Sequence, residues 1–494
     1  MIIHNARFYI DGSFDNDVKA LRVEDGIIIE LLNAIPARMQ PGDIDLDGDF
    51  AYPGFIDTHT HSFSGGLYSG GIDLQDYREI SSLLIRMKTA AQDMKPGSLL
   101  FAWNFDEASM AEQRFPTQVE LDAAAGDIYL LLRRIDGHSC MISSNARAQI
   151  EGIKSSDVIL RSEDNDRATH WFHSNSDETG IIKAYREAAS VAMKGGFCTV
   201  HTMIGDADQS IDHFQLMQAR SSELPIEYIL YPQSFNIQAA LAAGAQRIGG
   251  CILADGSIGS HTAALSAPYE DDDSRGSLYH NDRFWREFIG SAHQHGLQVC
   301  VHCIGDAAIR QINSIYLDLN YKHPADLRHQ LIHCELTPDD LVAQIKASGA
   351  VPVMQPVFDF LWGGKTGFYA LRLGADRAMR MNRFASFTAQ GVKVTGSSDW
   401  YVTPMNIAMS VYACIHHHNP SERLTPEEAI RVYTENAAWL SHDEQRLGKL
   451  SPGFQADLSV LDTDLTAPFH YHDVQVKYIV KKGKSVHAYS PHSS

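Results

Sequence analysis

The sequence lacks a long hydrophobic run, because none of its apolar stretches reaches the roughly 18 residues that a membrane-spanning helix needs. It is also poor in cysteine, with 7 in 494 residues, scattered and mostly inside apolar stretches. This usage argues against a disulfide framework and predicts reduced, buried thiols. The first residues, MIIHNARFYIDG, lack the basic and apolar parts of a signal peptide. We therefore expect a cytoplasmic protein without membrane association.

Positive charge is scarce as well. The chain has 41 Lys and Arg against 61 Asp and Glu, a formal net charge of −20, which would repel the phosphates of a nucleic acid. Hydrophobic residues make up 44% and charged residues 21%, proportions typical of a globular protein and not of a disordered chain or a coiled coil. The length allows one large α/β barrel with attachments, or roughly two to four smaller domains.

The two ends of the chain predict β structure. Residues 1–52 contain short apolar runs separated by Asp-Gly turns, and residues 445–494 contain the runs ADLSVLD and VKYIVKKGKSVHAY. Because both β-rich ends flank a middle of different pattern, we predict one small β-sandwich domain formed by residues 1–52 and 445–494.

The middle, residues 53–444, repeats a helical pattern, a glycine and a short apolar run. AYREAASVAMKGG precedes FCTVHTMIGD, for example, and FWREFIGSAHQHG precedes LQVCVHCIGD. Glycine caps such helices, and unbroken apolar runs suit parallel strands that are buried on both faces. We predict eight strands, near 54–61, 127–138, 197–206, 251–257, 297–306, 329–335, 350–356 and 392–400. This α/β order favours a (β/α)8 TIM-type barrel.

Two helix starts in this middle region are marked by local chemistry. The segments Thr337-Pro338-Asp339-Asp340 and Thr425-Pro426-Glu427-Glu428 each offer an N-cap threonine, a proline at the first helical position and an acid three residues after the cap. We therefore expect helices to begin at Pro338 and Pro426.

Polar side chains stand where the predicted strands end, and the active site of a TIM barrel forms at those ends. His59 and His61 are two residues apart on one strand, so both can face one site. The later strands carry His302, His333 and Asp399. Imidazoles and a carboxylate that converge from different strands suit Zn²⁺, or less often Fe, Mn or Ni. The pattern predicts a metal site.

The sequence also resembles a known family. PGFIDTHTH at 53–61 resembles the strand-1 signature of the metal-dependent amidohydrolase superfamily, and the later histidines and Asp399 follow in that family's order. The resemblance is closer to the YtcJ-like branch, which includes N-substituted formamide deformylases. The matching segments cover nearly the whole chain: DGH at 136–138, ADGSIGSHTAAL at 254–265, VHCIGD at 301–306, HCE at 333–335, GSSDW at 396–400 and LSPGFQADL at 450–458.

The resemblance implies a function and a ligand set. His59 and His61 would bind one metal ion together with Asp399, and His302 and His333 would bind a second ion. The reaction would be hydrolysis of a C–N bond in an amide, formamide or cyclic amide by a metal-activated water, with Asp399 as general base and then acid. The expected cofactor is one or two Zn²⁺ ions, other divalent metals being possible, and the expected partner is a small-molecule substrate. Homodimers are common in the family.

Other functions use the same parts. A deaminase and an ester or lactone hydrolase need similar ligands, and fold alone does not set the substrate. A non-catalytic barrel that binds a small molecule is the alternative from another class.

Cys251 departs from the family pattern, because the branch usually has a lysine there, four residues before the aspartate of the Ala-Asp-Gly motif. Carboxylated on its amine, that lysine can bridge two metals. Three interpretations stay open: the Cys251 thiolate ligates or bridges metal, the site holds one metal with Cys251 as a bystander, or metal and activity have been lost.

Three further residues are predicted to contact substrate. The resemblance suggests this role for His138, which follows a predicted strand. Asp255 and His261 flank a turn rich in glycine and serine that could lie over the site. The branch often has arginine at the position of His261.

Overall fold

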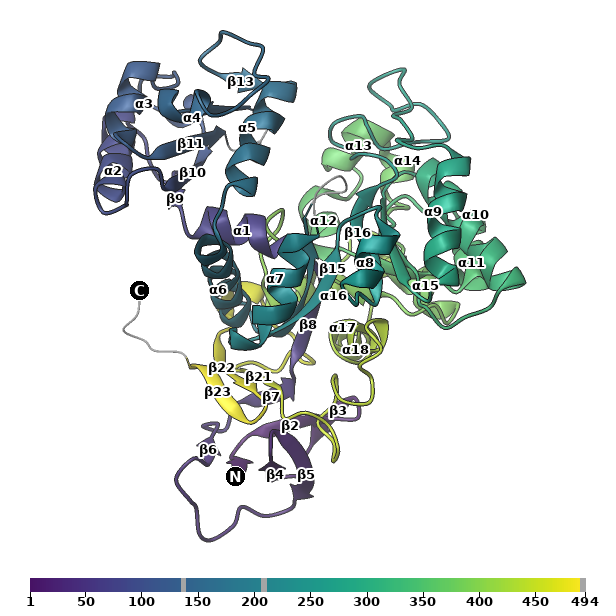
Figure 1. Cartoon of the computed structure of the whole chain (residues 1–494). Coiled ribbons are helices and arrows are strands. Elements are labelled where there is room, and N and C mark those ends of the chain that lie inside the picture. The colour runs from purple at the N-terminus through teal and green to yellow at the C-terminus, as the bar shows by residue number, and fades with distance from the viewer. Residues whose placement is uncertain (135–138, 206–210, 489–494) are drawn as a thin grey trace. The chain divides into compact units, whose positions relative to one another are not determined.

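The computed structural model describes residues 1–134, 139–205 and 211–488. The chain divides into two compact units, one made of Met1–His61 with Ala189–Ser494, and the other of Ser62–Ala188 (Figure 1). The sequence prediction placed all of residues 53–444 in one barrel domain, so the separate unit within this range was not foreseen.

Parallel strands form the centre of the larger unit. A three-stranded sheet has the order β15-β14-β8, and a five-stranded sheet has the order β16-β17-β18-β19-β20. The strands are β8 (Phe55–Thr60), β14 (Phe197–Ile204), β15 (Glu227–Pro232), β16 (Arg247–Leu253), β17 (Gln298–Cys303), β18 (Gln330–His333), β19 (Val351–Met354) and β20 (Thr395–Gly396). Every residue of β8, β14, β17, β18 and β19 is buried, as expected for strands covered on both faces.

Contacts also join the edges of these two sheets. β15 lies beside β16, and the Gln233 side-chain amide after β15 donates a hydrogen bond to the Cys251 carbonyl (3.3 Å). At the other edge, Thr60 forms a parallel bridge with Trp400, and the His61 amide donates to the Trp400 carbonyl (2.6 Å). The arrangement is of TIM-barrel type.

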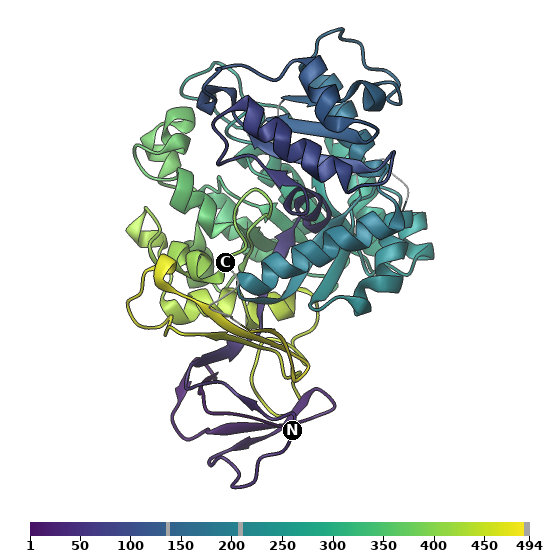
Figure 2. The ribbon, with the colours of Figure 1, turned by 90° about the vertical axis from the view of Figure 1, so that its left-hand side faces the viewer.

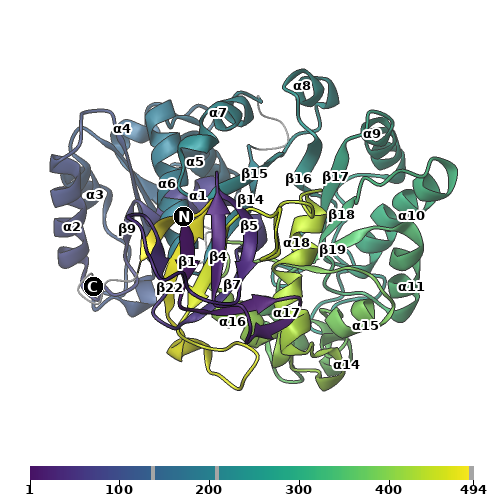
Figure 3. The same ribbon diagram turned by 90° about the horizontal axis from the view of Figure 1, so that it is seen from below.

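Helices follow the strands in the expected alternation. Figure 3 shows α9, α10 and α11 on the outer side of β17, β18 and β19. The helices of this unit are α7 (Asp212–Arg220), α8 (Ile237–Ala242), α9 (Asp282–Gln294), α10 (Asp306–Lys322), α11 (Asp339–Ser348), α12 (Pro356–Trp362), α13 (Phe368–Leu373), α14 (Ala375–Ala378), α15 (Phe384–Ala389), α16 (Ile407–Ile415), α17 (Pro426–Val432) and α18 (Glu435–Leu440). Within the described ranges, no helix has the length and apolar character needed to cross a membrane.

The two ends of the chain meet in one sheet, as predicted for a small β-domain. Figure 2 shows the C-terminal strands beside the N-terminal ones, and the six-stranded sheet has the order β23-β22-β21-β7-β2-β3. Its strands are β2 (Arg7–Ile10), β3 (Ser13–Asp15), β7 (Phe50–Pro53), β21 (Leu458–Leu461), β22 (Val476–Lys481) and β23 (Lys484–Ala488). A four-stranded sheet contains β1 (Ile2–His4), β4 (Ala20–Glu24), β5 (Ile27–Leu32) and β6 (Ile44–Asp45).

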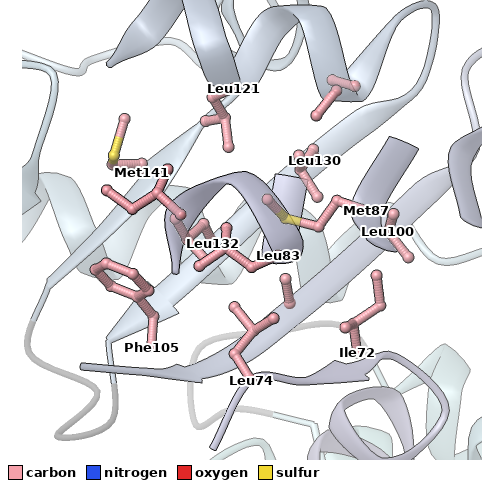
Figure 4. Packing of buried hydrophobic residues seen from close by; sticks show 14 of the residues in the cluster. Ile72, Leu74, Leu83, Met87, Leu100, Phe105, Leu121, Leu130, Leu132 and Met141 are labelled. Carbon is pink, nitrogen blue, oxygen red and sulfur yellow. The ribbon is translucent and has the colours of Figure 1, made fainter. Parts of the chain in front are cut away.

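The second unit has its own sheet and core. Its five strands have the order β13-β12-β11-β10-β9, with bounds Ile72–Asp73 for β9, Leu99–Phe105 for β10, Tyr129–Arg134 for β11, Ser139–Ile142 for β12 and Leu160–Arg161 for β13. Leu83 and Met87 of α2 (Ile80–Gln92) pack with Leu100 and Leu132 of the sheet (Figure 4). The other helices are α1 (Ser62–Ser69), α3 (Gln118–Ala125), α4 (Ser144–Arg147) and α5 (Ser162–Ser174), and α6 (Glu178–Lys194) leads into the larger unit.

This unit corrects one predicted strand. The run at 127–138 was expected to be the second strand of the barrel, but β11 pairs with β10 and with β12 in the sheet of the second unit. The parallel strand that the prediction omitted is β15, at Glu227–Pro232. The apolar pattern identified 127–138 as a strand but missed Glu227–Pro232, and it carries no information about which sheet a strand joins.

A buried network of ion pairs connects the terminal sheet to β15. Lys481, at the end of β22, donates to Asp457 (2.6 Å) and to Glu227 (2.9 Å), and only 9% of its side chain is exposed. Burial raises the pKa of Glu227, but Lys481 and Arg446 outweigh this effect and bring it well below its ordinary value. Glu227 therefore stabilises the fold above its unfolded pKa, and this contribution is lost as the pH falls.

The substitution Lys481→Met should lower the free energy of unfolding by about 3–5 kcal/mol at pH 7, because it leaves the buried Asp457 without its cation and Glu227 with Arg446 alone. The difference from wild type should shrink as the pH falls below about 4, the unfolded pKa of a glutamate, because the stabilisation of ionised Glu227 is lost progressively there. Urea denaturation at both pH values measures this. Lys484→Met, at an exposed position of β23, is the matched control, and an equal effect of both substitutions would contradict the prediction.

Candidate metal centre

Six predicted ligands converge at the carboxyl ends of the parallel strands. His59 lies in β8 and His61 follows it, Cys251 lies in β16, His302 in β17, His333 ends β18, and Asp399 follows β20. Two sets of ligand atoms lie within 4.8 Å of one another and could each hold a metal ion, namely His59 with Cys251 and His333, and His59 with His61 and Asp399. The topology thus assembles residues that lie as far as 340 positions apart in the sequence.

Direct distances connect the members of the cluster. Asp399 Oδ1 lies 3.2 Å from Nε2 of both His59 and His61. On the other side, Cys251 Sγ lies 3.8 Å from His302 Nδ1, and the His302 and His333 rings are 4.5 Å apart. Cys251 therefore stands between the two histidine pairs.

Hydrogen bonds outside the cluster fix which ring nitrogen faces inward. His302 Nε2 donates to the Gly256 carbonyl (3.1 Å), so that in the neutral, metal-binding form of the ring Nδ1 has its lone pair towards Cys251. The Gln355 amide nitrogen donates to Ser397 (2.9 Å), so its oxygen accepts from His333 Nδ1 (2.8 Å). His333 then offers Nε2. Such outer partners orient metal-binding imidazoles.

The donor set fits a divalent metal. Among the described residues, both ring nitrogens of His59 and Oδ1 of Asp399 are buried and have no hydrogen bond of acceptable geometry. A buried polar atom without a partner is costly, and a metal ion would satisfy these atoms. Nitrogen, sulfur and carboxylate donors together are typical of zinc and related transition metals.

The electrostatics agree with this fit. Burial would raise the pKa of the Cys251 thiol, but His302, His333, His59 and His61 outweigh it and bring that pKa well below the ordinary value. Burial likewise opposes ionisation of Asp399, yet His59 and His61 hold its pKa low. The thiolate and the carboxylate, which are the metal-binding forms, are thus both favoured.

The backbone at the strand ends is held in uncommon conformations. His333, Cys334 and Asp399 have φ values of 70°, 51° and 53°, in the left-handed region that non-glycine residues rarely adopt. Asp57 helps to hold one of these turns, because its buried carboxylate accepts from the Ser398 amide (3.1 Å). Strained backbone of this kind clusters at functional sites.

A cavity of about 450 Å³ opens onto the cluster. His61, Cys251, His302, His333 and Asp399 line it from the metal-centre side. The remaining wall is largely apolar and aromatic, with Leu253, Ile258, Ile304, Phe358, Trp362, Phe368, Tyr369 and Val402. The cavity is large enough for a small-molecule substrate.

Of the three residues predicted to contact substrate, two do not line the cavity and one lies outside the described residues. Asp255 is fully buried, does not line the cavity, and accepts from the Ile304, Gly305 and Ala264 amides (3.0, 2.8 and 2.8 Å). His261 pairs with Asp271 (2.8 Å) and packs against Tyr269, and it does not line the cavity either. His138 lies outside the described residues. The geometry favours a role for Asp255 in holding the turn after β17.

Sequence reasoning missed two polar residues of the site. Gln355, which orients His333, directly follows the apolar run of β19, and Glu335, which lines the cavity, follows His333 by two positions. Both are polar residues just after a buried strand, and that position was the available signal.

Fold and site together define a metal-dependent hydrolase. The model of the amidohydrolase family matches residues 43–487, and the chain belongs to this family. It is 26% identical to the YtcJ amidohydrolase of Bacillus subtilis, over 98% of this chain and 99% of that protein. It is 22% identical to the N-substituted formamide deformylase of Arthrobacter pascens, over 85% of each chain.

Solved structures share the fold. An uncharacterised metal-dependent hydrolase from Pyrococcus furiosus superposes with a TM-score of 0.79 at 24% identity, over 94% of this chain and 99% of that chain. A second one, from Pyrococcus horikoshii, has a TM-score of 0.79 at 21% identity, over 98% and 99%. Nearly the whole length of this chain therefore corresponds to a known architecture.

The position of Cys251 between two histidine pairs predicts a loss of metal when it is replaced. Cys251→Ala should contain fewer metal ions per chain than wild type, because the ion between the pairs loses its thiolate ligand. Elemental analysis of freshly purified protein measures this. Cys414→Ala, at a buried cysteine of α16, is the matched control and should keep the wild-type content. Equal metal content in all three proteins would make Cys251 a bystander.

Proposed function

We propose that the protein hydrolyses a C–N bond in an amide, formamide or cyclic amide. The observation that carries this proposal is the position of Asp399, whose Oδ1 lies 3.2 Å from both His59 and His61 and which also lines the cavity. A carboxylate placed between metal ligands and a substrate-sized cavity can take a proton from water and deliver it to a leaving nitrogen. The formamide deformylase relative supports a C–N bond as the target.

The ligand assignment follows from the two sets of donor atoms. His59, His61 and Asp399 would hold one ion, and His302 with His333 would hold a second. The Cys251 thiolate would bridge the two sites, because it lies against both histidine pairs. We favour Zn²⁺, since thiolate and imidazole are its preferred ligands.

The residues of the site would then have separate roles in the reaction. A bound divalent ion would supply Lewis acidity, which activates water and polarises the scissile carbonyl. Asp399 accepts the proton of the attacking water at its carboxylate and returns it to the leaving nitrogen. Gln355 and Gly256 hold His333 and His302 in the correct tautomer, and the apolar cavity wall keeps bulk water away from the substrate.

We also infer the complete architecture from the strand pairings. The contacts of β15 with β16 and of Thr60 with Trp400 support closure of the two parallel sheets into one (β/α)8 barrel. The two terminal sheets share buried residues such as Ile3, Phe8, Leu21 and Val460, which supports a β-sandwich.

Asp399→Asn should lower kcat/KM for N-substituted formamides by about 10²–10⁴-fold, because the amide can no longer accept the proton of the attacking water. Steady-state kinetics on metal-loaded protein measure the change, with metal content checked in parallel. Asp376→Asn, at an exposed position, is the control. Wild-type rates in Asp399→Asn would refute the role of Asp399.

Removal of the metal tests the wider proposal. Chelator-treated wild type should lose the activity and regain it on addition of Zn²⁺, because His59 and Asp399 alone offer no Lewis acid. Full activity of protein shown by elemental analysis to be metal-free would rule out the metal-dependent mechanism.

A further inference from the structure

The wall of the cavity next to the metal centre has few charged side chains beyond the candidate ligands. Within the described part of the chain, no lysine or arginine lines it. Its ionisable side chains beyond the candidate ligands are those of Glu335 and Tyr369. An anionic substituent on a substrate would find no counter-charge from a side chain outside the metal centre.

Glu335 itself is placed to bind a hydrogen-bond donor. The residue is 2% exposed and lines the cavity, and its Oε2 is a buried atom without a hydrogen-bond partner among the described residues. Burial raises the pKa of the same carboxyl group to about 7, and the nearby Tyr369 hydroxyl opposes this rise. A buried acceptor that is left open on a cavity wall gains most from a ligand N–H group.

Aromatic side chains that line the same cavity determine which other groups a ligand can carry. The Phe358 and Trp362 rings pack at a tilt of 58° with centroids 4.7 Å apart, and the Trp362 and Tyr369 ring centroids are 6.1 Å apart. Phe368 completes this aromatic wall of the cavity. Aromatic faces favour an apolar body and also attract cations.

We propose that Glu335 is a specificity-determining residue that binds an N–H group, uncharged or cationic, on a substrate with an apolar or aromatic body. The same arrangement discriminates against anionic substrates. This inference rests on the proposed hydrolase function and narrows its substrate class.

The test compares three formamides on one scaffold. Each is the formamide of a 2-arylethylamine whose ring carries, in the para position, an aminomethyl, a methyl or a carboxylate group. Metal-loaded wild type should prefer the ammonium compound to the carboxylate by about 100-fold or more in kcat/KM, because Glu335 can accept from the ammonium group and no lysine or arginine among the described lining residues can pair with the carboxylate. Equal kcat/KM values for these two compounds would overturn the proposal.

Glu335→Gln removes the charge and keeps the shape. It should reduce the preference for the ammonium over the methyl compound about tenfold, mainly through KM, as expected for a lost binding interaction. Glu287→Gln, at an exposed position of α9, should leave all three substrates unchanged. An equal fall in kcat for all three substrates in Glu335→Gln would indicate proton transfer and would overturn the specificity role.

Binding measurements separate this proposal from the proposed function. If wild type hydrolyses none of the formamides, calorimetric titration of the same compounds still decides the role of Glu335. Tighter binding of the ammonium compound, lost in Glu335→Gln, would support Glu335 while the hydrolase proposal fails. If Glu335→Gln proves unfolded or metal-free, the wild-type ranking of the three compounds decides alone.

Discussion

The structure depends on a cluster of candidate metal ligands at its centre, where burying polar side chains costs free energy unless their atoms find partners. His59 is fully buried, and Cys251, His333 and Asp399 are nearly so. Among the described residues, both ring nitrogens of His59 and Oδ1 of Asp399 have no hydrogen bond of acceptable geometry. Such a cluster is stable when its members neutralise one another or share a cation. The thiolate and carboxylate favoured here among four imidazoles are the forms that a divalent metal requires.

Rigid surroundings make that arrangement possible. Parallel strands with fully buried residues bring the ligands together at their carboxyl ends. Buried carboxylates accept hydrogen bonds from the turns that follow these strands. Asp57 accepts from the turn that carries Asp399, and Asp255 accepts from the turn after His302. These two buried carboxylates do not line the cavity, but they set the positions of residues that do. A site built on strand ends in this way keeps its geometry before substrate arrives.

The two sides of the cavity differ in the interactions that they offer a substrate. Its metal-centre side offers nucleophile activation and a proton acceptor, while its aromatic side offers apolar contact and the open carboxylate of Glu335. On the proposed role of Glu335, substrate preference depends on residues that take no part in the metal cluster. This separation is common where one fold hosts many reactions.

The sequence by itself determined the parallel α/β class, the β-rich ends and the candidate ligands. Alternation, glycine caps and strand-end histidines are local signals, and the helix start at Thr425, with its capping box to Glu428, was readable for the same reason. The same signal was wrong at Thr337, because α11 begins at Asp339 after Pro338 and the Thr337 hydroxyl donates to the Cys334 carbonyl (2.9 Å). Tertiary structure alone decided that 127–138 joins a separate sheet, that Glu227–Pro232 is a parallel strand beside β14, and that Cys251 lies against both histidine pairs. It also placed Gln355 behind His333 and Glu335 in the cavity wall. Strand pairing and side-chain convergence depend on contacts between residues far apart in the chain, and a local pattern contains no record of them.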